Sequence, residues 1–345
     1  MSTLLITGVA GPLGRQMARL AADAGMRVLG VDVAPLARPL PDITFIQSDV
    51  RNPLLADFMK AEGVNAILHA AFRWRQRRGE AVFENNVLGT AKLLEAAVRA
   101  KVEHIIFPSS ILVYGPGAIQ ASEEVTFQVR SRYAFIRHLR SIEILFEGFR
   151  SQAAGVTLTV LRFGHILGGG YPSPLARYLA LPVAPTLQGH NPLMQVLHFD
   201  DAILILMQTL LERPNGIYNI TAPEPQALYA MLDRCHTPHT PLSPLLIEGA
   251  RWLPGIGPRT KTILPLPWEY LRDSLTVDVG KAVQTLGFEP VHPGEDVVRA
   301  FARELNDQRK HASFPLRTTY QGVEGVTQTL EKAEKLIEQG IKRLI

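Results

Sequence analysis

The chain has 345 residues, of which 46% are hydrophobic and 20% are charged, a composition typical of a soluble globular protein with one large domain or two closely joined lobes. Its formal net charge of +4 is small for this length, and no basic cluster is interleaved with aromatic residues, so we expect no nucleic-acid partner. The single cysteine, Cys235, excludes an intrachain disulfide, which agrees with a reducing compartment. The chain shows neither an N-terminal signal sequence nor an apolar run of about 18 residues. We therefore expect a cytoplasmic protein without a transmembrane segment.

The N-terminal residues alternate between apolar strands and a helix around a glycine-rich turn. An apolar strand over residues 2–7 is followed by three glycines spaced G-x-x-G-x-x-G and by a helix expected over residues 12–24. A second apolar strand, residues 27–31, ends at Asp32. This succession of strand, glycine turn, helix, strand and acid predicts a dinucleotide-binding site rather than an ordinary strand-to-helix turn.

The individual residues of this segment suit a dinucleotide. Gly8 permits a tight turn, Gly11 lets the backbone approach a pyrophosphate, and Gly14 allows the helix and the strand to pack closely. Free N–H groups and a partial positive charge at the helix N-terminus favour the phosphates. Asp32 can accept hydrogen bonds from a ribose diol and would repel a 2′-phosphate, so we predict NAD rather than NADP as the cofactor.

Strands and helices continue to alternate through the first half of the chain. The apolar runs expected to be strands are nearly continuous, as in a parallel sheet covered on both faces, and they lie at residues 43–46, 66–69, 104–107 and 157–161. Helical patterns are found at residues 53–62, 84–100 and 133–151. We therefore predict a Rossmann-type, doubly wound parallel α/β sheet with helices on both faces.

The alternation breaks after the last of these strands, where glycine and proline become frequent. We predict an NAD-binding domain over residues 1–163, rejoined by a strand–helix–strand unit over residues 195–220. Residues 164–194 and 221–309 are expected to form a smaller substrate-binding lobe at the carboxyl edge of the sheet. Residues 310–345 have the pattern of an added amphipathic helix, which docks on its own chain, on a protein partner or on a membrane surface.

Seven short motifs follow one another along the chain. They are Thr7-Gly8-x-x-Gly11-x-x-Gly14, Asp49-Val50-Arg51, His69-Ala70-Ala71, Asn86-Val87-Leu88-Gly89-Thr90, Ser109-Ser110-Ile111-Leu112-Val113-Tyr114-Gly115, Leu161-Arg162 with Gly168, and His198-Phe199-Asp200-Asp201. In this order the chain resembles the extended short-chain dehydrogenases/reductases, the NAD-dependent epimerase/dehydratase family, over about residues 2–304. The resemblance implies that NAD is bound by Gly8, Gly11, Pro12, Leu13, Gly14, Asp32, Asp49, Val50, Ala70, Ala71, Asn86, Ser109, Tyr133 and Arg137.

The resemblance also implies a catalytic serine, a tyrosine and, four residues after the tyrosine, a lysine. Ser110 takes the serine position and Tyr133 the tyrosine position, and we predict that both are catalytic. A free tyrosine has a pKa of about 10, which a nearby cation lowers, so the phenol can exchange a proton with a substrate hydroxyl while hydride moves to or from the nicotinamide. The serine hydroxyl would hold the reacting oxygen.

The chain departs from the family pattern at two positions. Arg137 stands where lysine is expected; it keeps the positive charge, but it is longer and planar and does not deprotonate. Arg137 is therefore either the electrostatic, catalytic partner of Tyr133 or a sign that catalysis has been lost. His165 stands at the asparagine position of the family's Arg-x-x-Asn-x-x-Gly segment, which weakens the case for a nucleotide-sugar. The predicted substrate contacts are Phe72, Ser110, Tyr114 and His165.

Two functions are therefore predicted. The first is an NAD(H)-dependent oxidoreductase or epimerase that acts on a hydroxyl or carbonyl group of an unidentified small molecule; the alternative is a catalytically impaired, nucleotide-binding structural subunit. No metal site is expected, because the histidines near Cys235 lack a second ligand pair. The basic run over residues 73–78 is either a solvated loop or a patch for an anionic ligand. As in many family members, a homodimer is expected through the helices over residues 84–100 and 133–151.

Overall fold

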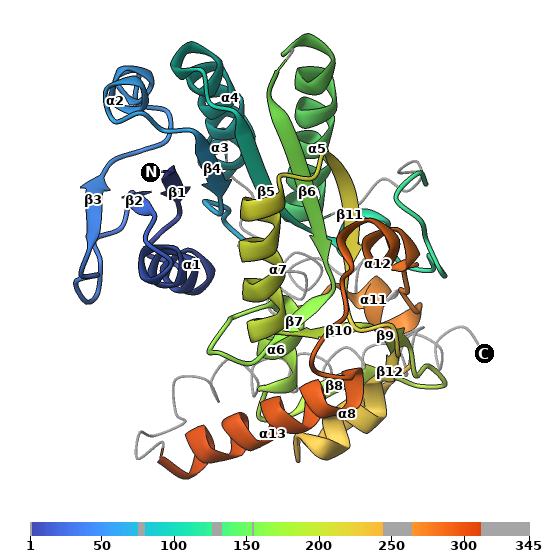
Figure 1. Ribbon diagram of the computed structural model, residues 1–345. Helices are drawn as coiled ribbons and strands as arrows, with labels where there is room; N and C mark the ends of the chain where they lie inside the picture. The colour runs from blue at the N-terminus through green and yellow to red at the C-terminus, as the bar shows by residue number, and fades with distance from the viewer. Residues whose placement is uncertain (1, 75–79, 126–132, 154, 244–263, 312–345) are drawn as a thin grey trace.

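The centre of the molecule is one sheet of seven parallel strands in the order β11-β6-β5-β4-β1-β2-β3 (Figure 1). The computed structural model describes residues 2–74, 80–125, 133–153, 155–243 and 264–311. The strands are β1 (Thr3–Thr7), β2 (Arg27–Asp32), β3 (Ile43–Gln47), β4 (Ala66–His69), β5 (His104–Ser110), β6 (Thr157–Phe163) and β11 (Gly216–Ile220). The chain winds outward from β1 in both directions, which confirms the predicted doubly wound Rossmann-type sheet.

The strand β1 lies at the point where the winding direction changes. Thr7, its last residue, pairs with Val31 of β2 on one side and with His69 of β4 on the other. In open sheets of this kind, ligands bind in the crevice outside the carboxyl ends of the strands at such a point. The glycine turn, the end of β2 and the segment after β4 therefore meet where a ligand is expected.

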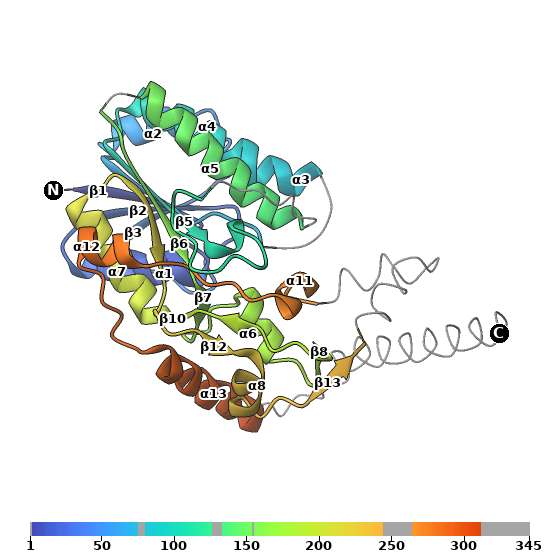
Figure 2. The same cartoon turned by 90° about the vertical axis from the view of Figure 1, so that its right-hand side faces the viewer.

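Helices cover both faces of the sheet (Figure 2). One face carries α2 (Leu55–Ala61), α4 (Gly89–Ala100) and α5 (Ala134–Gln152), and the other carries α1 (Pro12–Asp23) and α7 (Phe199–Glu212). Each face has its own cluster of buried side chains: Leu5 belongs to one cluster, whereas Leu4 and Ile6 belong to the other. Because successive residues of a strand point to opposite faces, this double burial explains why the strands are continuously apolar.

The helices beside the sheet begin differently from the prediction. The helix expected over residues 84–100 starts earlier, with α3 (Glu80–Phe83), continues through a π-helical turn (Glu84–Leu88) and then becomes α4. Such wide turns are rare and are often found at functional sites. The helix expected from residue 133 begins one residue later, because Tyr133 has the extended backbone of an N-cap residue, with φ −87° and ψ 124°.

Smaller elements follow β6 in the chain, and most of them lie below the sheet in the view of Figure 1. They are β7 (His165–Leu167), α6 (Pro174–Leu179), β8 (Ala184–Leu187), β9 (Leu193–Met194), β10 (Val196–His198), β12 (Gln226–Ala227), α8 (Leu228–Arg234), β13 (His239–Leu242), α11 (Trp268–Arg272), α12 (Gly280–Leu286) and α13 (Gly294–His311). Of the unit over residues 195–220, α7 and β11 join the sheet layers, whereas β10 pairs with β7 outside the main sheet. Ala282 and Leu286 of α12 belong to the same buried cluster as Leu4 of β1.

Two sequence predictions concern residues that the structure does not describe. The predicted tail helix, residues 310–345, lies outside the described residues from residue 312 onward, as do residues 75–78 of the basic run. Within the described ranges, no helix combines the length and the apolar character that crossing a membrane requires.

Candidate functional site

The glycine turn after β1 packs directly against the segment that follows β4. Gly8 has a φ of 76°, and a Cβ atom at this position would lie 2.7 Å from backbone atoms of Ala70 and Ala71. A Cβ atom on Gly14 would lie 2.5 Å from the carbonyl oxygen of Gly8. Both distances are far below ordinary contact distances, so a side chain at either position would force these backbones apart. The structure thus brings together four residues of the predicted cofactor site.

The carboxylate of Asp32 is held beside the glycine turn by the backbone. Its Oδ2 atom accepts a hydrogen bond from the N–H of Ala10 at 3.0 Å, and its Oδ1 atom accepts one from the N–H of Ala34 at 2.9 Å. Each oxygen keeps a further lone pair, so both can still accept a hydrogen bond from a ribose diol. The helix α1 begins at Pro12, and its N-cap residue, Gly11, has no side chain that could bond the backbone N–H groups of the first turn. These N–H groups are therefore suited to phosphate oxygens.

Two further predicted cofactor residues, Asp49 and Val50, follow β3. The guanidinium of Arg51 lies 2.8 Å from Oδ2 of Asp49 and 3.3 Å from Oε2 of Glu84. This hydrogen bond to Arg51 lowers the pKa of Asp49, so the carboxyl group is ionised at neutral pH. Val50 is almost fully buried and packs against Gly89, the first residue of α4. The two residues therefore lie at the edge of the sheet, anchored to the start of α4.

Asn86, another predicted cofactor residue, holds the loop that follows β4. Its Oδ1 atom accepts a hydrogen bond from the N–H of Arg73 at 2.9 Å, and its Nδ2 atom donates one to the carbonyl oxygen of Arg73 at 3.1 Å. Asn86 is fully buried on the π-helical turn. These bonds fix the loop that carries Phe72 and Trp74, whose rings lie 5.0 Å apart in an edge-on arrangement.

A chain of hydrogen bonds that sequence reasoning did not foresee connects the glycine turn to α4. The hydroxyl of Thr90 donates to the carbonyl oxygen of Asn86 at 2.6 Å, so it accepts from Nε2 of His69, 2.8 Å away. The Nδ1 atom of His69 then accepts from the hydroxyl of Thr7 at 2.7 Å. His69 is buried, which lowers its pKa to about 4 and keeps it neutral, as this chain of bonds requires.

Ser110, the predicted catalytic serine, lies at the end of β5 and lines a cavity of about 30 Å³. Its Oγ atom accepts a hydrogen bond from the N–H of Leu112 at 3.3 Å, at the start of the short 3-10 helix Ile111–Val113. The hydroxyl proton can therefore be donated to a ligand oxygen. Leu13, from the first turn of α1, lines the same cavity, which places the cavity beside the glycine turn. The other lining residues are Trp74, Pro108, Ser109, Leu112, Phe163, Gly164, His165, Ile166, Tyr171, Ser173 and Pro174.

Tyr133 and Arg137 do not line this cavity. The hydroxyl of Tyr133 accepts a hydrogen bond from the N–H of Trp268 at 3.4 Å, and Arg137 is exposed. The apolar side chains that α5 directs into the core from this region are Phe135, Ile136 and Leu139, which are at most 1% exposed. Successive helical residues are about 100° apart, so Arg137 lies on the side of the helix opposite Phe135. The structure thus places Ser110 in the cavity without Tyr133 and Arg137.

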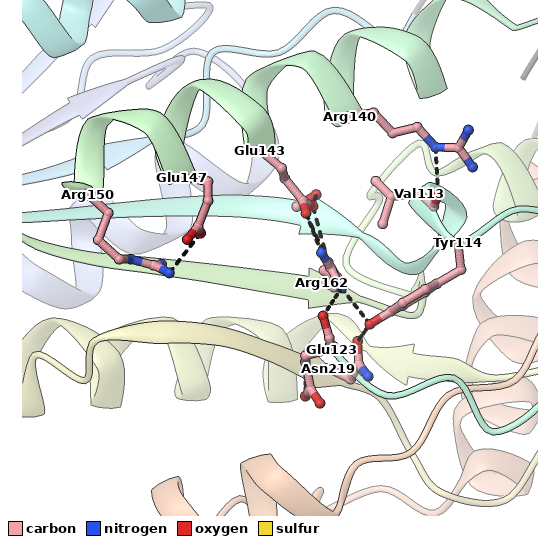
Figure 3. A network of polar contacts seen from close by, with 10 residues as sticks. Val113, Tyr114, Glu123, Arg140, Glu143, Glu147, Arg150, Arg162 and Asn219 are labelled. Atoms are coloured by element: carbon pink, nitrogen blue, oxygen red, sulfur yellow. Dashed lines mark hydrogen bonds and ion pairs between the residues drawn. The ribbon is translucent and has the colours of Figure 1, made fainter. Parts of the chain in front are cut away.

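A buried polar network adjoins Ser109, which is also a predicted cofactor residue. The hydroxyl of Ser109 donates to Glu143, and Oε2 of Glu143 lies 2.6 Å from Nη2 of Arg162; both charged side chains are 3% exposed. Arg162 also donates to the hydroxyl of Tyr114 at 2.6 Å, and that hydroxyl donates to Oδ1 of Asn219 at 2.8 Å (Figure 3).

This network determines what Tyr114, a predicted substrate contact, can do. Its ring is buried, its hydroxyl is engaged on both sides, and burial raises its pKa to about 12. Tyr114 is not among the residues that line the cavity. The motif Leu161-Arg162 indicated the arginine, but no sequence signal indicated Glu143, its partner 19 positions away, or Asn219, the partner of Tyr114 at a separation of 105 positions.

His165, the predicted substrate contact at the start of β7, lies at the cavity wall. It is 4% exposed, and its backbone N–H donates to the carbonyl oxygen of Gln195 at 3.0 Å. Burial lowers the pKa of the imidazole to about 4, so it is neutral at physiological pH. Its Nε2 atom is buried and has no hydrogen-bond partner among the described residues.

Known proteins share this architecture and parts of this sequence. The uncharacterized protein Rv0501 of Mycobacterium tuberculosis is 29% identical over 232 residues, which cover 64% of this chain and 62% of the relative's own length. A UDP-glucose 4-epimerase of Halalkalibacterium halodurans is 31% identical over 121 residues, 32% of this chain and 36% of that protein. The structure of MoeE5 in complex with UDP-glucuronic acid and NAD has a TM-score of 0.69 at 23% identity, and covers 89% of this chain and 100% of that chain.

The family comparison covers the whole sheet. The model of the NAD dependent epimerase/dehydratase family matches residues 4–221, from β1 to just after β11. This range contains the glycine turn, Asp32, Ser110 and the buried network behind Ser109. The chain therefore belongs to the NAD-dependent epimerase/dehydratase family.

Proposed function

We propose that this chain is an NAD(H)-dependent oxidoreductase or epimerase that acts on a hydroxyl or carbonyl group of a small molecule. The observation that carries the proposal is the close packing of Gly8 and Gly14 beside Asp32, which leaves backbone N–H groups and a carboxylate for a dinucleotide. Ala70 and Ala71 flank the turn, and Asp49 and Val50 are proposed to contact the adenine. NAD, when bound, supplies the hydride acceptor or donor.

Ser110 is proposed to hold the reacting oxygen of the substrate. The Oγ atom of Ser110 already accepts a hydrogen bond from the N–H of Leu112, so its hydroxyl proton is available for donation to a second partner. A substrate oxygen in the cavity is the acceptor of suitable chemistry. Replacing Ser110 by alanine should therefore reduce turnover by about 10²-fold while NAD affinity stays unchanged.

Tyr133 is proposed to exchange the proton, with Arg137 as a weak electrostatic partner; this assignment rests on the family motif, because Tyr133 lies outside the cavity that Ser110 lines. Tyr133 is half-buried at the N-terminus of α5, whereas Arg137 is exposed one turn further along. Water screens an exposed charge, so its effect on a nearby proton transfer is small. We expect Tyr133→Phe to abolish turnover and Arg137→Gln to retain most of it. Equal losses in both variants would contradict this assignment.

A second candidate function, NAD binding without turnover, is favoured by the inner face of α5. Neither Tyr133 nor Arg137 lines the cavity, and the first buried side chains of α5, Phe135 and Ile136, cannot carry a proton. The deciding experiment measures NAD binding by calorimetry, and then follows NADH absorbance and product NMR spectra with a panel of alcohols, ketones and nucleotide-sugars. Turnover that is lost in Tyr133→Phe supports the enzyme. NAD binding with no turnover of any compound supports the second candidate.

We also propose a homodimer through α4 and α5. Leu88, the residue before α4, is 47% exposed, and Val98 on α4 is 48% exposed. Ile144 on α5 is 64% exposed. Both helices therefore carry exposed apolar surface. Burying this surface against a second copy would remove it from water. The mass in solution should be that of two chains, and Ile144→Glu should halve it, whereas Lys92→Gln on the same helix pair should not.

A further inference from the structure

The short 3-10 helix after Ser110 sets the direction of the Ser110 hydroxyl. The helix consists of Ile111–Val113, and the Oγ atom of Ser110, its N-cap residue, accepts the hydrogen bond from the N–H of Leu112. One backbone hydrogen bond closes this turn, from the N–H of Tyr114 to the carbonyl oxygen of Ile111 at 3.0 Å. A single turn is unstable by itself, because one bond does not offset the entropy lost when its residues are fixed. The geometry around Ser110 therefore depends on the groups that hold the turn from outside.

Two side chains from distant elements bind the remaining carbonyl groups of the turn. The Nε atom of Arg140 on α5 donates to the carbonyl oxygen of Val113 at 2.7 Å (Figure 3). The hydroxyl of Tyr270 on α11 donates to the carbonyl oxygen of Leu112 at 2.8 Å, across 158 positions of the chain. Both side chains are buried, so water does not compete with them for these oxygens. All three carbonyl groups of the turn thus have a donor, and its peptide planes are fixed.

The helix that carries Tyr270 also contacts the second proposed catalytic residue. The backbone N–H of Trp268, the first residue of α11, donates to the hydroxyl of Tyr133 at 3.4 Å. Tyr270 lies two residues further along, and burial raises the pKa of its phenol, which therefore stays protonated and remains a donor at neutral pH. One short helix from outside the main sheet thus binds both the N-terminus of α5 and the turn that follows β5.

We propose that Tyr270 is a positioning residue for Ser110: its hydroxyl fixes the carbonyl group of Leu112, and through the turn it aims the Ser110 hydroxyl at the reacting oxygen of the substrate. Tyr270 does not line the cavity that Ser110 lines, so it acts through the turn and not on a ligand. This inference rests on the proposed function, since it concerns the serine of that same site.

The first test measures the turn and needs no substrate. Tyr270→Phe removes only the hydroxyl, so the buried carbonyl group of Leu112 loses its donor. Hydrogen–deuterium exchange of the amides of residues 111–114, followed by NMR in the full-length protein, should become about tenfold faster, because the turn opens more often. Exchange rates equal to those of the wild type would overturn the proposal.

Tyr178→Phe is the matched control for this measurement. Tyr178 on α6 is also fully buried, and its hydroxyl donates to the carbonyl oxygen of Pro185 at 2.7 Å. Its loss should lower the urea midpoint of unfolding to a similar extent but leave the exchange of residues 111–114 unchanged. An equal rise of exchange in both variants would mean that Tyr270 stabilises the fold in general, which would also overturn the proposal.

The second test separates positioning from stability by kinetics. On the alcohol, ketone or nucleotide-sugar that the wild type converts fastest, Tyr270→Phe should lower kcat by about tenfold and leave KM unchanged, because the bond from Ser110 strengthens as charge develops on the reacting oxygen. In a Ser110→Ala background the same substitution should cause no further loss, and a second tenfold loss there would refute the role of Tyr270. NAD binding without turnover of any compound would refute the proposed function instead, whereas the exchange rates would still decide whether Tyr270 holds the turn.

Discussion

Acid should destabilise this protein through its buried histidines, and most strongly through the three whose pKa is lowered furthest. His69, His104 and His165 are 2%, 0% and 4% exposed, and burial lowers the pKa of each to about 4. In the unfolded chain the pKa of histidine is about 6.5. Between these two pH values, the unfolded chain binds protons that the folded chain does not.

The size of the effect follows from these pKa values. The stability is complete above about pH 6.5, falls as the pH is lowered toward about 4, and levels off below that value. At about pH 5, each histidine lowers the free energy of unfolding by about 2 kcal/mol, and the three together by about 6 kcal/mol. Since domains are commonly stable by roughly 5–15 kcal/mol, unfolding is expected near pH values of about 4 to 5.

Urea unfolding at pH values of about 7.5, 6 and 5, followed by circular dichroism, measures this dependence. His104→Gln should lower the slope by about one third, because it removes one of the three groups while the amide can still bond the hydroxyl of Thr159. The control is His236→Asn at an exposed histidine, which should leave the slope unchanged. A free energy of unfolding that is constant over this range, or an equal slope in His104→Gln, would refute the reasoning.

Three further variants test the cofactor turn, the buried network and the core. Gly14→Ala places a Cβ atom 2.5 Å from the carbonyl oxygen of Gly8, so NAD affinity measured by calorimetry should fall by at least about tenfold. Unchanged affinity would contradict the prediction that the glycine turn binds NAD. Glu143→Gln leaves the buried charge of Arg162 without its counter-charge and should lower the free energy of unfolding by about 3–5 kcal/mol in urea titrations. Phe107→Ala removes a ring that is 1% exposed, and a loss of about 3–5 kcal/mol is expected, whereas a loss below about 1 kcal/mol would show that the core closes around the gap.

Local sequence was sufficient to predict the sheet and the cofactor turn. The strand before Gly8, the helix after it and the acid at position 32 all lie within one short segment, and their spacing alone determines which groups meet at the end of β1. Because both faces of the central strands are buried, residues such as Leu5 and its neighbours are all apolar, and the strands can be recognised in the sequence as continuous apolar runs. The same reasoning gave less accurate helix starts, because nothing in the sequence signals the π-helical turn at residues 84–88.

The surroundings of the proposed catalytic groups depend instead on residues far apart in the chain. Tyr114 and Arg162 could be read as motif residues, yet Glu143 and Asn219, which determine their hydrogen bonds, come from other elements. In the same way, sequence spacing put Arg137 one turn after Tyr133, but only the docking of α5 on the sheet determined that it faces solvent.

The sequence by itself therefore determined that this chain has a Rossmann-type sheet, and it predicted the residues of a dinucleotide site, because strand periodicity and glycine spacing act locally. Only the tertiary structure decided that Ser110 and His165, whose Nε2 atom has no hydrogen-bond partner among the described residues, line one cavity and that Tyr133 and Arg137 do not. The physical reason is that burial, and with it the charge state of a histidine or a carboxylate, depends on which elements pack together and not on position along the chain.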